Sequence, residues 1–206
     1  MYIPKHNRIE DRAAIAALIR RFSFGTLVTQ GPGGLVATHL PFLFDPSAGL
    51  QGKLVAHMAR ANPQWKNFAQ TEVLVIFQGE HGYISPTWYV NSPAVPTWNY
   101  QAVHAYGVPA IIAEPQRILG TMREIVEQYE SADSSYRIDR LPEPYRDRML
   151  AGIVAFEIEL TRADAKSKLS QNMKSEDVLG AIKGLEESGR AESLRLAAAM
   201  RTTHGV

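Results

Sequence analysis

The sequence predicts a β-rich α+β fold, in which short antiparallel strands form a barrel or sandwich with helices at its flanks. Three observations predict this class. Short β-type runs recur at regular spacing, turns rich in Gly and Pro separate them, and neither a β-α alternation nor a glycine-rich nucleotide loop is present. One domain over 1–206 is expected, with 165–206 as a helical C-terminal extension.

An amphipathic helix is expected before the first strand, over residues 11–22. Its members Ile15, Leu18, Ile19 and Phe22 follow the i, i+3, i+4, i+7 spacing of one apolar helix face. The segments that follow have strand character and are bounded by turn residues. We expect strands at 25–30, 35–44, 53–59 and 73–78, with turns at 31–34 and 45–49.

A short helix is expected between the third and fourth strands, at 62–68. Asn62 has the side chain of a helix cap, and Pro63 suits the first helical position. Beyond it, 81–113 holds no Asp, Glu, Lys or Arg but several Trp and Tyr residues. A stretch of this length without charge is expected to be buried, at an interface or lining a pocket. It should form a strand, an ordered loop at 91–96 and a long strand at 98–113.

The last 90 residues return to helical patterns around one further strand. In the strand, 153–160, apolar side chains alternate with Glu157 and Glu159, as in a half-buried strand. Gly189 is placed to end a helix that begins at Ser175. Helices are expected at 115–130 and 143–150, from Ser175 to Gly189, and at 190–201.

Composition excludes several functional classes. The chain has 206 residues with 22 basic and 21 acidic side chains, so a net charge of +1 gives no support for direct DNA binding, which stays open because a dimer can concentrate a modest basic patch on one face. The absence of Cys removes disulfides and thiolate nucleophiles, and the six His residues show no metal-binding spacing. No catalytic triad, signal peptide or membrane span is recognised, and we expect a cytoplasmic protein.

Three segments could carry chemistry. In His57–Pro63 a strand passes into a helix, where Arg60, His57 and backbone N–H groups could hold a phosphate; an exposed Arg and an ordinary cap is the alternative. The Pro-Thr-Trp repeats at 86–88 and 96–98 offer rings for stacking or for an interface. The segment 166–172 is rich in donors, or else a solvated loop before the cap at Ser175.

In chain order, these segments resemble the PaiB-type family of FMN-binding negative transcriptional regulators. The resemblance rests on seven short motifs between residues 1 and about 188. They are Met1–His6, Phe24–Val28 with Thr38–Pro41, His57–Trp65, Val75–Gly79, Tyr83–Tyr89, Val95–Tyr100 and Lys168–Asn172.

The resemblance implies an FMN-binding split β-barrel that works as a homodimer. It places the phosphate near His57, Met58, Arg60 and Asn62, and the flavin ring beside the second strand with Gln78 near. Five further residues are expected to approach from the partner subunit or to cap the site: Trp98, Asn99, Lys168, Ser170 and Gln171. The predicted cofactor residues are Thr38, His39, Leu40, Pro41, His57, Met58, Arg60, Asn62, Gln78, Trp98, Asn99, Lys168, Ser170 and Gln171.

The implied function is negative regulation of transcription, with sensing of a flavin or of its redox state. An FMN-dependent oxidoreductase acting on a small planar or hydrophobic substrate is the alternative, because a bound flavin needs little from the protein beyond placement. A barrel without a working flavin site is a third reading. It is motivated by the short loop at 90–94 and by Ser167, where the family often has Trp.

Overall fold

The computed structural model describes residues 1–68 and 71–206, which form the antiparallel, β-rich α+β fold that the sequence predicts. The strands lie in one sheet in the order β3-β2-β6-β7-β8-β5-β4, and β1 pairs with β8. The strands are β1 (Arg8–Ile9), β2 (Phe24–Gly31), β3 (Gly34–Pro41), β4 (Leu43–Asp45), β5 (Lys53–Ala59), β6 (Val73–Ile84), β7 (Thr97–Ile111) and β8 (Ile153–Lys168).

Helices connect and follow these strands. None of the helices in the described part of the chain is long and apolar enough to cross a membrane. The α-helices are α1 (Arg12–Arg21), α2 (Pro115–Tyr129), α3 (Glu143–Ala151), α4 (Ser175–Glu187) and α5 (Ala191–His204). The short 3-10 helices are η1 (Lys5–Asn7), η2 (Pro63–Asn67), η3 (Pro86–Trp88) and η4 (Ile138–Arg140).

The chain divides into two compact units. Unit 1 comprises 1–15, 78–103 and 164–206, and unit 2 comprises 16–77 and 104–163. The strands β6, β7 and β8 each contribute residues to both units. The single domain expected from the sequence stays a prediction, and each unit is described by itself.

Unit 2 has a core of alternating residues from neighbouring strands. On β5 every second side chain is buried, and on β8 Val154, Phe156, Ile158 and Leu160 are buried while Glu157 and Glu159 are not, which confirms the predicted alternation in 153–160. The rings of Phe42 and Phe77 meet edge to face at 5.5 Å, close to Gly25. A Cβ atom at Gly25 would lie 2.8 Å from the Phe77 ring, so only glycine fits there.

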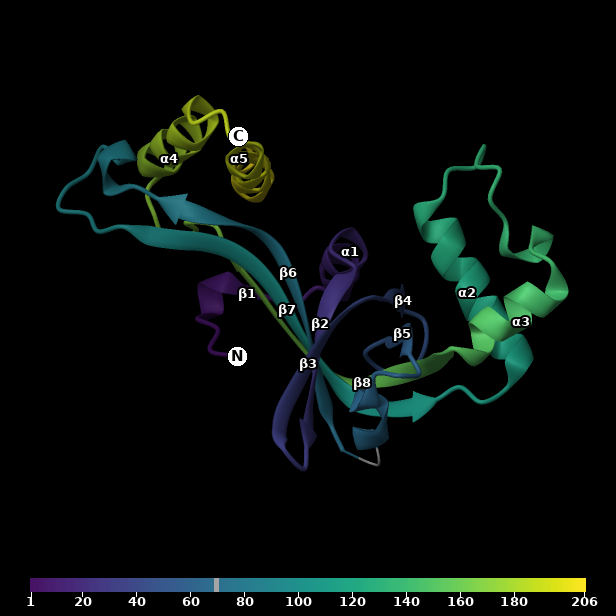
Figure 1. Ribbon diagram of the computed structural model, residues 1–206. Helices are drawn as coiled ribbons and strands as arrows, with labels where there is room; N and C mark the ends of the chain where they lie inside the picture. The colour runs from purple at the N-terminus through teal and green to yellow at the C-terminus, as the bar shows by residue number, and fades with distance from the viewer. Residues whose placement is uncertain (69–70) are drawn as a thin grey trace. The chain divides into compact units, whose positions relative to one another are not determined.

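The hairpin of β2 and β3 lies in unit 2 and forms as the sequence predicts. Its register ends at the pair Gly31–Gly34, and Gly34 has a φ of 111°, a conformation that suits glycine. In Figure 1 the two strands lie side by side in this hairpin. The strand expected at 35–44 is divided into β3 and β4 at Phe42, whose side chain is buried.

Unit 1 has its own core between α4 and α5, which pack against each other in Figure 1. Trp88 of η3 lies against this pair, where Gly180 and Gly184 leave space for its backbone and ring. Gly189 ends α4 with a φ of 65°, as predicted. The buried members of the cluster are Ile84, Leu169, Val178, Ala181, Ile182, Leu185, Leu196, Ala197 and Met200.

Several boundaries differ from the sequence prediction, among them the strand expected at 73–78, which continues to Ile84 as β6. The strand expected to end at 160 continues to Lys168, because its later residues pair with β1 in the register Arg8–Lys166 and Ile9–Ala165. The helix expected to be capped by Ser175 has Lys174 at the cap position, with Ser175 as its first residue. Neither the β1 pairing nor the shifted cap has a local sequence signal.

Candidate functional site

The predicted cofactor residues fall into the two units. Unit 2 holds the residues assigned to the phosphate and to the strand beside the ring, and unit 1 holds the rest. In unit 2 these are Thr38, His39, Leu40 and Pro41 on β3, His57 and Met58 on β5, and Arg60 and Asn62 before η2; in unit 1 they are Gln78, Trp98, Asn99, Lys168, Ser170 and Gln171.

In unit 2, a hydrogen bond joins the two predicted segments. Asn62 Nδ2 donates to Thr38 Oγ1 at 3.0 Å, so the strand assigned to the ring is tied to the segment assigned to the phosphate. Asn62 Oδ1 accepts the backbone N–H of Gln64 at 3.0 Å, which confirms the predicted cap. The helix it caps is the five-residue 3-10 helix η2, with Pro63 at its first position.

Gln64 anchors this segment to the β2–β3 hairpin, and the sequence analysis did not single it out. Its side chain is buried, and Nε2 lies within hydrogen-bond distance of Leu27 O, Thr29 Oγ1 and Val36 O at 3.1–3.2 Å. A buried amide that spans two strands and a helix fixes their relative placement inside unit 2. The only local signal was its position after the Asn-Pro cap.

Arg60 is held at the start of β8. Its Nε donates to the carbonyl oxygen of Ala151 and its Nη2 to that of Ile153, both at 2.7 Å. Within the described residues, no carboxylate pairs with this exposed guanidinium, and Nη1 makes no hydrogen bond. Arg60 therefore retains its charge and part of its donor set for an anion.

His57 and Met58 are placed differently from each other. Met58 is buried in the unit 2 core, so its side chain contributes packing there. His57 is half-buried, its Nδ1 has no partner among the described residues, and burial lowers the pKa of its imidazole. Since its usual pKa is 6.5, His57 is neutral near pH 7 and offers a hydrogen bond rather than a charge to a phosphate.

The outer side of the β2–β3 hairpin is apolar and exposed. Phe24, which is 66% exposed, stacks on His39 with ring centroids 6.2 Å apart, and Leu35 is 76% exposed on the same face. Leu40, in contrast, points into the core. A flat face with exposed rings is the type of surface that a second molecule covers.

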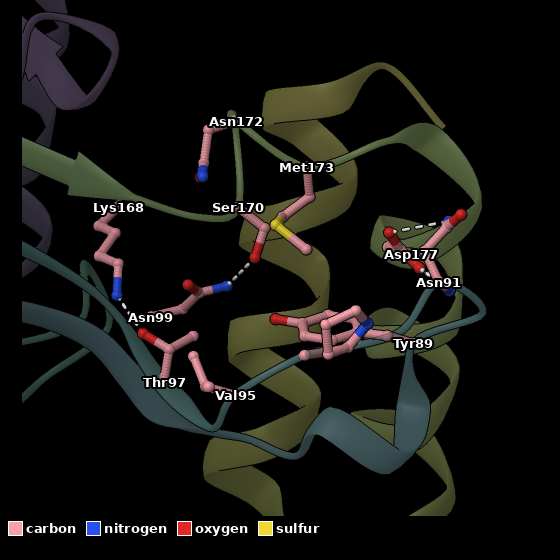
Figure 2. Close-up of a pocket in the computed structure, with 12 residues that line it drawn as sticks. Tyr89, Asn91, Val95, Thr97, Asn99, Lys168, Ser170, Asn172, Met173 and Asp177 are labelled. Atoms are coloured by element: carbon pink, nitrogen blue, oxygen red, sulfur yellow. Dashed lines mark hydrogen bonds between the residues drawn. The ribbon is translucent and has the colours of Figure 1, made fainter.

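Unit 1 contains a pocket of about 540 Å³, shown in Figure 2. It lies between the loop before β7, the first residues of β7, the end of β8 and the start of α4. Its size is within the range of small-molecule sites. The residues that line it are Tyr89, Asn91, Pro93, Ala94, Val95, Thr97, Asn99, Lys168, Ser170, Asn172, Met173 and Asp177.

Lys168 provides the positive charge of the pocket. Its Nζ donates to Thr97 Oγ1 and, at 2.8 Å, to the carbonyl oxygen of Trp98. Burial lowers the pKa of this ammonium group, and the nearby Lys166 lowers it further while Tyr100 raises it. Two of the three N–H groups of Lys168 are therefore used, and one remains.

Asn99 and Ser170 form a buried pair on the pocket wall. Asn99 Nδ2 donates to Ser170 Oγ at 2.9 Å and contacts Met200 Sδ at 3.5 Å. Because a thioether sulfur only accepts, the amide nitrogen must face it, and Asn99 Oδ1 turns toward the Lys168 side in Figure 2. This oxygen is buried and has no hydrogen-bond partner in the described part of the chain.

Asp177 fastens the loop over the pocket to the first turn of α4. Its Oδ1 accepts the backbone N–H groups of Val90 and Asn91 at 2.8 and 3.0 Å, and its Oδ2 accepts Asn91 Nδ2. These bonds, the Asn91 backbone bond first, lower the pKa of the Asp177 carboxyl. These bonds hold the loop at 90–91 against the start of α4.

Three other predicted residues of unit 1 do not line the pocket. Gln171 folds back on its own loop, accepting from Leu169 N and donating to Ser167 O. The indole of Trp98 is 55% exposed and meets Tyr83 edge to face. Gln78 is exposed on β6.

The structure overturns one alternative and widens the set of pocket residues. The reading of 166–172 as a solvated loop is wrong, because Lys166, Ser167, Leu169 and Ser170 are buried. Of the twelve lining residues, only Asn99, Lys168 and Ser170 were among the predicted cofactor residues, and Asp177 had been considered only as part of a helix start. Within 1–68 and 71–206, no three His, Asp or Glu side chains gather as metal ligands.

Comparisons with known proteins agree with the predicted family. The family model described as "Putative FMN-binding domain" matches residues 1–162. The "Protease synthase and sporulation protein PAI 2" of Bacillus subtilis is 37% identical over 202 residues, which cover 97% of this chain and 96% of that protein.

Two solved structures show the same fold. A flavocytochrome from Azotobacter vinelandii matches with a TM-score of 0.66 at 13% identity, over 86% of this chain and 78% of that one. A FAD and heme binding protein from Mycobacterium smegmatis matches with a TM-score of 0.62 at 16% identity, over 85% and 80%. These likenesses confirm the predicted split-barrel fold.

Proposed function

The chain belongs to the PaiB-like family described as "Putative FMN-binding domain", and on this premise we propose that it binds FMN and acts as a flavin-responsive negative regulator of transcription. The observation that carries the proposal is the hydrogen bond between Asn62 and Thr38 in unit 2. It ties the strand expected beside the flavin ring to the segment expected at the phosphate.

The donor set of this segment suits a phosphate monoester. Arg60 supplies a charge with no carboxylate partner in the described residues, and neutral His57 can supply an N–H. The carbonyl oxygens of Ala151 and Ile153 orient the guanidinium before any ligand arrives. Preorganisation of this kind reduces the entropy lost on binding.

Replacing Arg60 by Ala is expected to weaken FMN binding by about 1.5–3 kcal/mol, the cost of a charge-assisted hydrogen bond. Riboflavin, which has no phosphate, should bind the variant and the wild type equally. Fluorescence titrations with both flavins measure the two affinities.

Lys66→Ala is the matched control, because Lys66 is an exposed cation in the same segment that lies over the Trp65 ring. It should leave FMN affinity unchanged. The phosphate assignment is wrong if Arg60→Ala weakens both flavins equally, since the loss then reflects a disturbed fold at Ala151 and Ile153.

A homodimer is part of this proposal. The exposed apolar side chains Phe24 and Leu35 on the β2–β3 hairpin support it, because burial against a second chain would remove them from water.

Regulation is proposed to be indirect. The arginines of the C-terminal helices face carboxylates: Arg201 lies 2.9 Å from Glu186, Arg195 3.4 Å from Glu80 and Arg190 3.6 Å from Glu192. Paired arginines have little charge left for DNA phosphates. The flavin-loaded protein would therefore act through another component of the transcription machinery.

A further inference from the structure

We propose that the pocket of unit 1 is a separate binding site for a small aromatic carboxylic acid that carries a hydroxyl or amino group. Asn99, Lys168 and Ser170, assigned to the flavin by resemblance, would serve this ligand instead. Five of the twelve lining residues lie after residue 162, where the match to the FMN-binding family model ends: Lys168, Ser170, Asn172, Met173 and Asp177.

Positive charge at the Lys168 end of the pocket has no carboxylate partner among the described residues. Lys168 and Lys166 stand two residues apart on β8 and neither has a carboxylate partner in the described part of the chain. Lys166 is 93% buried, lies 4.9 Å from the centre of the Tyr100 ring and donates to the carbonyl oxygen of Tyr2. Lys168 lines the pocket and Lys166 lies near enough to lower the pKa of Lys168, so the two cations together favour an anion in the pocket.

The donors at the pocket suit a carboxylate better than a phosphate. A phosphate site usually gathers several backbone N–H groups or an Arg. Here the N–H groups of Val90, Asn91 and Leu169 are already bonded to side chains, and no Arg lines the pocket. One remaining N–H of Lys168 is enough for a carboxylate oxygen.

A buried hydrogen-bond acceptor on the pocket wall, Asn99 Oδ1, has no partner in the described part of the chain. Asn99 Oδ1 lacks a partner in a residue that is fully buried, and leaving such an atom unsatisfied costs free energy. It turns to the same side of the pocket as the Lys168 ammonium, as Figure 2 shows. A ligand O–H or N–H would satisfy it while a carboxylate of the same ligand meets Lys168.

The walls of the pocket are apolar and partly aromatic. Pro93, Val95 and Met173 supply apolar surface, and the ring of Tyr89 supplies a flat one. In Figure 2 Asp177 lies at the opposite end from Lys168, and its oxygens are occupied by the 90–91 loop. The pocket is therefore polar at the Lys168 end and apolar along its walls, which suits a ring with one acidic substituent.

The test uses 4-hydroxybenzoate and its neutral analogue 4-hydroxybenzamide as probes, titrated by calorimetry into the full chain. The wild type is expected to bind the carboxylate about tenfold or more tightly than the amide. Lys168→Met should remove this preference while the amide affinity stays the same. Lys183→Met, at an exposed lysine on α4, should behave as the wild type.

A second pair of variants tests the location and does not depend on how Lys168→Met folds. Val95→Trp, at a lining position that is 76% exposed, should block both probes. Val90→Trp, at a 70% exposed position of the same loop that does not line the pocket, should not. In methyl spectra, the Met173 signal should shift on titration and those of Met122 and Met149 in unit 2 should not.

Three results would overturn the proposal. In the first, the wild type binds the two probes with equal affinity or binds neither at millimolar concentration. In the second, Val90→Trp and Val95→Trp lose binding equally. In the third, FMN displaces the bound probe. Displacement by FMN would show that the pocket is part of the flavin site. Failure of FMN to bind at all would contradict the proposed function but would not affect the carboxylate site.

Discussion

Replacing Gly184 by Ala is expected to lower the free energy of unfolding of the chain by about 3 kcal/mol, the upper part of the range for overpacking a core. The new Cβ would overlap the Trp88 ring, which is partly buried against the unit 1 core. The ring would have to move off α4 to make room, and the close approach of the Trp88 carbonyl to Gly180 on the same helix limits that movement. Urea denaturation followed by tryptophan fluorescence measures the change.

Gly120→Ala is the matched control for this experiment. Gly120 also lies in a helix, α2, but a Cβ atom there would meet nothing within 4 Å. The substitution should raise stability by up to about 1 kcal/mol, because Ala has the better helix propensity. Equal effects of the two substitutions would contradict the close packing of Trp88 on α4.

Replacing Gln64 by Ala is expected to destabilise the chain by a similar amount, about 3 kcal/mol. The loss would leave the carbonyl oxygens of Leu27 and Val36 without the amide donor that now bridges them. The backbone N–H of Gln64 would still donate to Asn62 Oδ1, but without the side-chain amide the segment proposed at the phosphate would lose its anchor to the hairpin. FMN affinity should fall together with stability.

The control for this prediction is Gln116→Ala, at an exposed position of α2. Thermal and urea unfolding should show a change within about 0.5 kcal/mol, as for most surface substitutions. A Gln64→Ala chain with unchanged unfolding would show that the amide does not hold η2 to β2 and β3.

Elements with a strong local pattern were predictable from the sequence. The strand predicted at 53–59 is β5 with the same bounds, and the helices predicted at 115–130 and 143–150 differ from α2 and α3 by one residue at one end. The extension of β8 to Lys168 was not, because it depends on pairing with β1 about 160 residues earlier in the chain. Pairing over such a separation has no periodicity of its own.

The candidate site shows the same division. The Asn62 cap could be read from Asn-Pro, because cap and helix start are adjacent. The anchoring of Arg60 could not be read from the sequence. Its acceptors are the backbone carbonyl oxygens of Ala151 and Ile153, and because every residue has a carbonyl, nothing in the sequence marks these two. The hydrogen bond between Asp177 and Asn91 spans 86 residues and likewise could not be predicted from the sequence.

A titration of the purified wild-type chain with FMN, followed by visible absorbance and flavin fluorescence, tests whether this chain is a flavoprotein. We expect saturable binding of one FMN per chain, with a shifted flavin spectrum. An unchanged flavin spectrum through tens of micromolar protein would contradict it, and would leave the split-barrel fold without the cofactor proposed for it.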